Sequence, residues 1–195
     1  MPNWSYVDYK IVGDKKKVKD FRDKIKRLEK RKTSPIKNDF GNLWWGNIVN
    51  ALGGNWEDVP CRGYIICWDY DRKTGVLTLC SEMAWSERPE LRYFIEEYYD
   101  NEVTIYFKQE ESGLSIYETN DSEGIFFPER YKIDGYVDPW PSYYKDLESA
   151  AKDLSRFIEI DEIEPTLEDI NDAIDKWVSI DPEENYLGLY IFEVV

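Results

Sequence analysis

The stretch from Tyr64 to Tyr117 constrains the fold most, because two hairpin patterns flank a single helical pattern. Apolar and polar residues alternate in residues 63–81 and again in residues 102–117, and turn residues interrupt each run, which predicts two β-hairpins. Gly75 lies in the first turn, where a positive φ favours glycine. Residues 86–99 carry apolar side chains at helical spacing. The order strand, strand, helix, strand, strand predicts an α+β fold.

A strand and a long helix are predicted before this stretch. In residues 4–12 the alternate positions that begin at Ser5 are the more apolar, so we expect them to face the core. Asp14 is placed to cap a helix over residues 15–31. This helix has one apolar stripe with spacings of three and four residues, which comprises Val18, Phe21, Ile25 and Leu28.

Local signals set the boundaries of two more helices. A helix over residues 40–52 is predicted to end at Gly53 and Gly54. The helix over residues 86–99 is predicted to begin after Ser86 as its N-cap. Trp85 precedes this cap, and we expect its ring to be buried against the first helical turn. Replacing a Trp buried in this way by Ala should cost about 3–5 kcal/mol.

The chain after Tyr117 has a different composition. We expect a short strand at residues 124–127 and a structured loop at residues 133–141, which contain two prolines. Thr166 and Asp169 have the spacing of a capping box. The predicted helices and the final strand occupy residues 143–158, 166–178 and 186–195.

Charge is distributed unevenly along the sequence. The chain has 25 basic and 40 acidic residues and a net charge of −15, but residues 1–37 alone have a net charge of +8. The acidic body argues against broad binding of nucleic acid, which depends on neutralising phosphates. The basic helix Lys15–Arg31 is the one segment for which we consider binding of nucleic acid or of an anionic lipid. The interpretation we favour is a solvated helix face with ion pairs along it.

Several observations bear on location and chemistry. We find no apolar run of about 18 residues, which a membrane span requires, and no signal-peptide pattern at the N-terminus. Three cysteines suit a reducing compartment, so we expect a cytoplasmic protein with no membrane partner.

The residue types that most enzymes use are scarce in this chain. It contains no His and shows no Gly-rich phosphate loop. We therefore assign no catalytic, cofactor-binding or metal-binding residue, and expect no cofactor. Glu82 and Glu111 flank the two hairpins and are the first candidates for a carboxylate pair.

The turn of the first hairpin places Cys67 opposite Cys80. A regulatory disulfide and a packed pair of small apolar side chains both fit this pairing, and we favour the packed pair.

Three short motifs resemble the YubB-like, ferredoxin-like proteins of plasmids and phages. They are Met1-Pro-Asn-Trp4, Met83-Ala-Trp-Ser-Glu-Arg-Pro89, and Glu111-Ser-Gly113 followed by a strand. The family tends to have Cys where Ser5 stands and a Trp-Gly-Thr-Lys-Trp motif in the middle. In this chain only Trp45-Gly46 and Trp56 resemble parts of that motif.

The resemblance implies a split βαβ antiparallel sheet with helices packed on one face. Here it would be extended by an extra hairpin strand and a C-terminal ααβ segment. It also implies carriage on mobile genetic elements, and no known activity. We expect residues 1–119 to form this core and residues 120–195 to form an acidic extension packed on the same globular body.

The favoured functional hypothesis is a non-catalytic protein-interaction or accessory factor of a mobile element, with an unknown protein partner. Exposed aromatic side chains are common interface anchors. The candidates for this surface are Trp44, Trp45, Trp56, Tyr136 and Trp140.

Two alternatives stay open. One is an acidic mimic of DNA with an anti-restriction role. The other is a carboxylate-based enzyme or carbohydrate binder, with Trp85, Tyr136 and Trp140 as stacking candidates.

Overall fold

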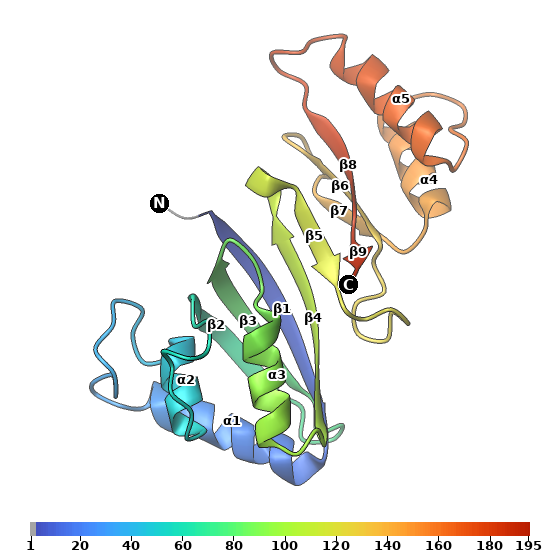
Figure 1. The fold of residues 1–195 in the computed structure, drawn as a ribbon. Coiled ribbons are helices and arrows are strands. Elements are labelled where there is room, and N and C mark those ends of the chain that lie inside the picture. The colour runs from blue at the N-terminus through green and yellow to red at the C-terminus, as the bar shows by residue number, and fades with distance from the viewer. Residues whose placement is uncertain (1–2) are drawn as a thin grey trace. The chain divides into compact units, whose positions relative to one another are not determined.

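The computed structural model of the chain describes residues 3–195 (Figure 1). Met1 and Pro2, which begin the first family motif, lie outside the described residues. The fold is mixed α+β, as predicted, and the chain divides into two compact units at Ile116 and Tyr117. No helix within residues 3–195 has both the length and the apolar character needed to cross a membrane. The expectation that residues 120–195 pack on the same body as residues 1–119 stays a prediction.

The first unit is a four-stranded antiparallel sheet with three helices. Its elements are β1 (Trp4–Gly13), α1 (Lys15–Glu29), α2 (Trp45–Ala51), β2 (Gly63–Tyr70), β3 (Leu77–Ala84), α3 (Pro89–Tyr98) and β4 (Val103–Glu111). The strands run in the order β2-β3-β1-β4, so β1 lies in the centre. It pairs with β3 from Trp4 opposite Ala84 to Ile11 opposite Leu77.

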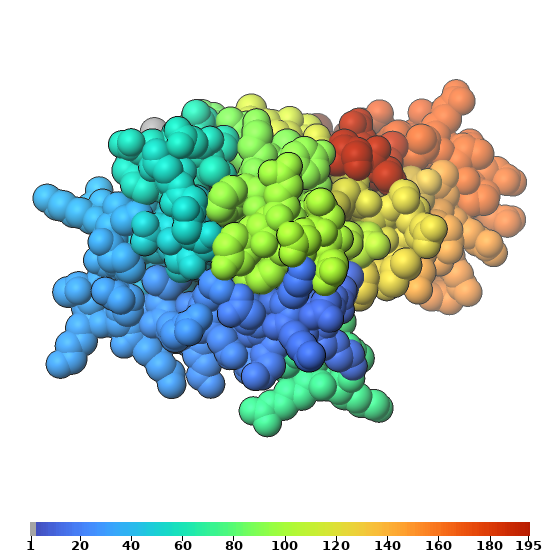
Figure 2. Space-filling view, turned by 60° about the horizontal axis from the view of Figure 1, so that its bottom comes forward, coloured from blue at the N-terminus to red at the C-terminus, as the bar shows by residue number. Residues whose placement is uncertain are grey.

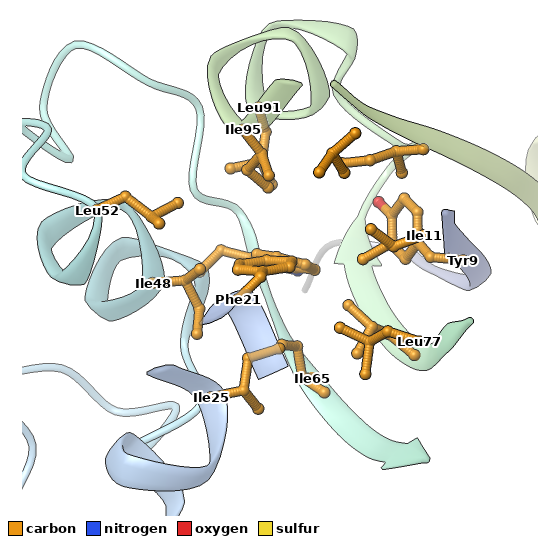
Figure 3. Close-up of a cluster of buried hydrophobic side chains, with 14 of the residues drawn as sticks. Tyr9, Ile11, Phe21, Ile25, Ile48, Leu52, Ile65, Leu77, Leu91 and Ile95 are labelled. Atoms are coloured by element: carbon orange, nitrogen blue, oxygen red, sulfur yellow. The ribbon is translucent and has the colours of Figure 1, made fainter. Parts of the chain in front are cut away.

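The helices α1, α2 and α3 cover one face of this sheet. Figure 2 shows them on one side of the unit, with α1 in blue, α2 in cyan and α3 in yellow-green. Their apolar side chains meet the sheet in one buried cluster (Figure 3). The predicted core face of β1 and the predicted stripe of α1 are confirmed, because all eight side chains are buried: Ser5, Val7, Tyr9, Ile11, Val18, Phe21, Ile25 and Leu28.

Local signals placed several helix ends correctly. Asp14 caps α1, because its carboxylate accepts hydrogen bonds from the backbone N–H groups of Lys16 at 2.9 Å and Lys17 at 3.0 Å. Gly53 ends α2 with a φ of +82°, and the N–H of Gly54 donates to the carbonyl of Val49. These bonds satisfy backbone groups that a helix leaves unpaired at its ends.

Three helix starts differ from the prediction because distant or side-chain partners fix the chain before them. The helix expected from residue 143 begins at Leu147, since residues 142–144 form a strand paired with residues 131–133. The helix expected from residue 40 begins at Trp45. The amide of Asn47 donates to the carbonyls of Gly41 and Asn42, which fixes the preceding turn. The helix expected after Ser86 begins at Pro89.

The chain before Pro89 is held by β4. The backbone N–H of Glu87 donates to Oε1 of Gln109 at 2.6 Å. Trp85 has a φ of +76° and its side chain is 44% exposed. The expectation that Trp85 is buried is therefore wrong, because the left-handed backbone at this residue leaves the ring half in solvent.

The second unit contains a three-stranded sheet and two helices. Its elements are β6 (Tyr131–Gly135), β7 (Ser142–Tyr144), α4 (Leu147–Phe157), α5 (Leu167–Val178), β8 (Leu187–Ile191) and β9 (Glu193–Val194). The sheet is antiparallel in the order β7-β6-β8. A further strand, β5 (Ile116–Thr119), follows a 3₁₀ turn at Ser112–Leu114 and pairs in parallel with β9. The larger sheet of the chain has the order β2-β3-β1-β4-β5-β9.

Some predicted elements of this unit are wrong. Residues 124–127 form a loop rather than a strand, because the Asp121 carboxylate accepts the N–H groups of Ile125, Phe126 and Phe127. Residues 133–135, the start of the predicted loop, belong to β6, since β7 and β8 supply pairing on both sides. The final strand is split into β8 and β9.

The capping box is confirmed. The backbone N–H of Asp169 donates to the hydroxyl oxygen of Thr166 at 3.1 Å.

Candidate functional site

Three of the five aromatic side chains proposed as interface anchors lie in a core. Trp44, Trp45 and Trp140 are buried, so the expectation that they are exposed is wrong. The indole N–H of Trp44 donates to the carbonyl of Cys61 at 2.7 Å, and that of Trp45 donates to the hydroxyl of Ser81 at 2.9 Å. These hydrogen bonds let two large rings be buried without leaving a donor unpaired.

The other two proposed anchors have exposed rings. Trp56 lies at the surface of the first unit, with its ring edge-on to Trp44 at 5.1 Å between centroids. Tyr136 belongs to the second unit and is 81% exposed, with its ring 4.8 Å from that of Tyr186. Their role in binding a partner stays a prediction.

The two carboxylates chosen from the sequence do not form a pair. Tyr6 pairs with Glu82 on one side and Glu110 on the other, so Glu82 lies on the sheet face that bears Tyr6. Glu111 follows Glu110 in β4 and faces the opposite side. Glu82 accepts a hydrogen bond from the Tyr64 hydroxyl, and this bond, followed by burial, raises the pKa of Tyr64 to about 12.

A buried polar cluster under α3 is closed. Arg92 and Glu87 form an ion pair with a distance of 3.3 Å between Nε and Oε1. Tyr9 lies nearby, and burial, then the charge of Glu87, raises the pKa of its hydroxyl. The cavity between these side chains has a volume of about 10 Å³, which is the room of one water molecule rather than of a substrate.

The basic face of α1 carries ion pairs, as the favoured interpretation predicted. The ammonium of Lys17 lies 2.8 Å from Asp100 and 3.1 Å from Glu102, and Lys24 pairs with Asp20. Binding of nucleic acid by this helix stays a prediction. Within residues 3–195, no three side chains of the His, Cys, Asp and Glu types are grouped to hold a metal ion.

The second unit has a groove that the sequence did not reveal. It has a volume of about 360 Å³ and lies between the end of α4, the loop that follows, and one face of α5. This volume is within the range of small-ligand pockets, roughly 300–1,000 Å³. We call it the acidic groove, and its lining residues are Ile158, Ile160, Glu162, Ile163, Glu164, Asp169, Asp172, Ala173, Lys176, Trp177 and Ile180.

The apolar part of the acidic groove has a buried base and exposed edges. Ile163 and Ala173 are buried, and Trp177 is half-buried with its ring 5.2 Å from that of Phe157. Ile160 and Ile180 are 45% and 77% exposed. Exposed isoleucines beside an apolar hollow mark a surface with apolar area left to bury.

The local sequence explains the shape of this groove. Glu159 has a φ of +58° after the last turn of α4, and the N–H of Ile160 donates to the carbonyl of Ser155 at 3.1 Å. This bond is typical of a helix end that turns the chain sharply. The turn directs the following loop across α5, where Asp169, Asp172 and Lys176 line the groove.

The groove is strongly acidic. Four exposed carboxylates line it, and Lys176 is the one lysine among the lining residues. The unit Tyr117–Val195 has 21 acidic and 6 basic residues out of the 40 and 25 in the chain. It therefore carries the whole net charge of −15. An apolar hollow in such a field favours an apolar ligand that also bears positive charge.

Sequence reasoning missed this groove because its apolar residues come from two helices and a loop. Ile158 ends the first predicted helix, and Ile160, Ile163 and Ile180 lie just outside the two predicted helices. This cluster of isoleucines outside the helical stripes was the signal that could have indicated the groove.

Comparison with known proteins gives no assignment: no family model, no curated protein and no solved structure matches the chain. The YubB-like resemblance stays a prediction.

Proposed function

We propose that this chain is a non-catalytic protein-interaction factor whose acidic groove binds a basic, amphipathic segment of a partner protein. The observation that carries the proposal is the combination of exposed isoleucines with four carboxylates around one apolar hollow. A partner helix with aliphatic side chains on one face and Lys or Arg beside them matches both features.

The apolar contacts and the charges of the groove contribute differently to binding. Burying an exposed aliphatic side chain such as Ile180 contributes about 1.5–3 kcal/mol, so the apolar contacts supply most of the affinity. The carboxylates, among them Asp169 and Asp172, attract the cationic partner and disfavour an acidic one. Affinity should therefore depend on both, and the contribution of the charges should weaken with added salt.

Two synthetic peptides test the proposal. Both carry the same isoleucines and leucines at helical spacing, but one has lysines and the other glutamates at the flanking positions. We expect calorimetry at low salt to show binding of the lysine peptide alone. Equal binding of both peptides, or of neither, would refute a groove that selects basic partners.

Matched variants locate the binding site. Ile180→Ser and Asp172→Lys change the groove. Each should lower the affinity for the lysine peptide at least about tenfold, which is a loss of about 1.4 kcal/mol of binding free energy. Ile125→Ser and Asp175→Lys are the controls, since Ile125 is also exposed and neither residue lines the groove. If the control variants weaken binding as much as the groove variants, the peptide binds to the acidic surface in general and not to the groove.

The acidic mimic of DNA stays a second proposal, favoured by the concentration of the whole net charge in Tyr117–Val195. A mimic would bind a cationic DNA-binding protein with a steep salt dependence. Its affinity would respond to Asp172→Lys and Asp175→Lys alike, and Ile180→Ser would have no effect. The enzyme or carbohydrate alternative loses a stacking candidate, because Trp140 is buried.

The finer description of the fold is also a proposal. We propose that the first unit is ferredoxin-like, supported by its strand order β2-β3-β1-β4, its antiparallel pairing and its helices on one face. The link to mobile genetic elements and the cytoplasmic location rest on the sequence alone.

A further inference from the structure

Two cysteines lie side by side on the sheet face opposite to the buried cluster of the first unit. Cys67 in β2 is directly opposite Cys80 in β3, and Cys80 is also opposite Asp8 in β1. Asp8 alternates with the buried Val7 and Tyr9, so this row of side chains faces away from the core.

The pairing suits a disulfide, because the ladder runs in register from Cys67 opposite Cys80 to Tyr70 opposite Leu77, and the β-bulge of β2 lies on the other side of Cys67, toward Ile65. Residues directly opposite in an antiparallel pair have Cα atoms about 4.5–5.5 Å apart. Disulfides span Cα distances of about 4.4–6.8 Å. Both thiols are free, Cys67 is exposed and Cys80 is half-buried. The exposure of Cys67 disfavours the interpretation of these residues as a packed apolar pair.

We propose that Cys67 and Cys80 form a thiol–disulfide exchange site that reacts with small disulfides of the glutathione type and closes into a cross-strand disulfide. This proposal is independent of the acidic groove.

The reaction has two balanced steps. The thiolate of Cys67 attacks one sulfur of the small disulfide, forms a mixed disulfide, and releases one small thiolate. Cys80 then attacks Sγ of Cys67, forms the protein disulfide, and releases the second small thiolate. Each released thiolate takes up a proton given to solvent by the attacking cysteine. The two protein thiols are oxidised and the small disulfide is reduced to two thiols.

The surroundings of the two thiols set this order. Burial, followed by the neighbouring Cys67 thiol and the Asp8 carboxylate, raises the pKa of Cys80 to about 12. Thiolate is the attacking species, so Cys80 is slow to react with a disulfide from solution. Cys67 is exposed and reacts with the small disulfide first. The mixed disulfide that forms on Cys67 then lies next to the thiol of Cys80.

Cys61 provides an internal reference. Burial raises its pKa to about 12, and it has no place in the row of Cys67 and Cys80. Of the three thiols in the chain, we expect the small disulfide to consume two and leave Cys61.

The test incubates the folded, reduced protein with oxidised glutathione without oxygen, followed by acid quenching, mass spectrometry and thiol counting after denaturation. We expect the wild type to lose two hydrogen atoms and retain one thiol, with a Cys67–Cys80 linkage in the peptide map. Cys61→Ser should close the same disulfide, which excludes a role for Cys61.

Two further variants separate the steps. Cys80→Ser should stop at one stable glutathione adduct on Cys67, and Cys67→Ser should remain unmodified over the same time. A wild type that keeps a stable glutathione adduct, remains unmodified, or forms only disulfide-linked dimers would overturn the proposal. Since serine is close to cysteine in size, circular dichroism of each variant confirms that the comparison is between folded proteins.

Discussion

Asp121 organises the loop between β5 and β6, and its replacement by asparagine should destabilise the protein strongly. One oxygen of its carboxylate accepts the N–H of Ile125 at 3.1 Å. The other accepts the N–H groups of Phe126 at 2.6 Å and Phe127 at 2.8 Å. Asp121 is 1% exposed, so water cannot replace these hydrogen bonds.

The magnitude follows from the bonds lost or weakened. Asparagine keeps one acceptor oxygen, which can accept from Phe126 and Phe127 but without the negative charge, while its amide N–H₂ group then faces the N–H of Ile125. Hydrogen bonds to charged groups are worth about 1.5–3 kcal/mol each. Asp121→Asn should therefore lower the free energy of unfolding by about 3 kcal/mol or more, a large part of the roughly 5–15 kcal/mol of a typical protein.

The effect should depend on pH in a defined direction. Burial acts to raise the pKa of Asp121, but the hydrogen bonds from Phe127, Phe126 and Ile125 outweigh it, so the pKa is lowered. A carboxylate with a lowered pKa stabilises the folded state above its unfolded pKa of about 3.9. This stabilisation is lost as the pH falls below about 4, through the folded pKa.

Urea unfolding followed by circular dichroism between pH 7 and pH 2.5 measures both effects. The difference between wild type and Asp121→Asn should be largest at pH 7 and shrink below about pH 4. Glu123→Gln, an equal charge change at an exposed position of the same loop, is the control and should change stability by less than about 0.5 kcal/mol. A difference under about 0.5 kcal/mol for Asp121→Asn, or one that persists unchanged at low pH, would refute the reasoning.

Two further predictions concern residues with a left-handed backbone. Trp85 is half exposed at a φ of +76°, so Trp85→Ala should cost about 2 kcal/mol, half the cost expected for a buried Trp. Trp85→Gly should be more stable than Trp85→Ala by about 1 kcal/mol, because glycine tolerates positive φ; thermal melts showing the opposite order would contradict this. Glu159 has a φ of +58° at the end of α4, so Glu159→Gly should raise the free energy of unfolding by about 0.5–1 kcal/mol. Urea unfolding measures this gain, and a loss of stability would show that the Glu159 side chain makes a stabilising contact.

The sequence determined the elements whose signals are local. The stripe Val18, Phe21, Ile25 and Leu28 and the alternation in β1 placed a helix and a strand with the correct faces. Asp14 and Thr166 placed two helix starts. These predictions succeeded because the hydrogen bonds of a cap and the period of a helix or strand involve residues a few positions apart.

Elements that depend on distant partners were decided by the tertiary structure alone. Residues 133–135 of β6 were predicted as the start of a loop, because the strand character of β6 comes from pairing with β7 and β8. The start of α3 depends on Gln109, which lies 22 positions from the residue that it binds. A single sequence carries no signal for such contacts, since many side chains could make them.

The candidate sites show the same division. The sequence correctly placed Cys67 opposite Cys80, because a hairpin turn fixes the register of both strands. The sequence did not indicate which apolar side chains are exposed. Trp44, Trp45 and Trp140 are buried, whereas Ile160 and Ile180 are exposed. Exposure depends on what packs against a side chain, and the acidic groove exists only where the end of α4, its following loop and α5 meet.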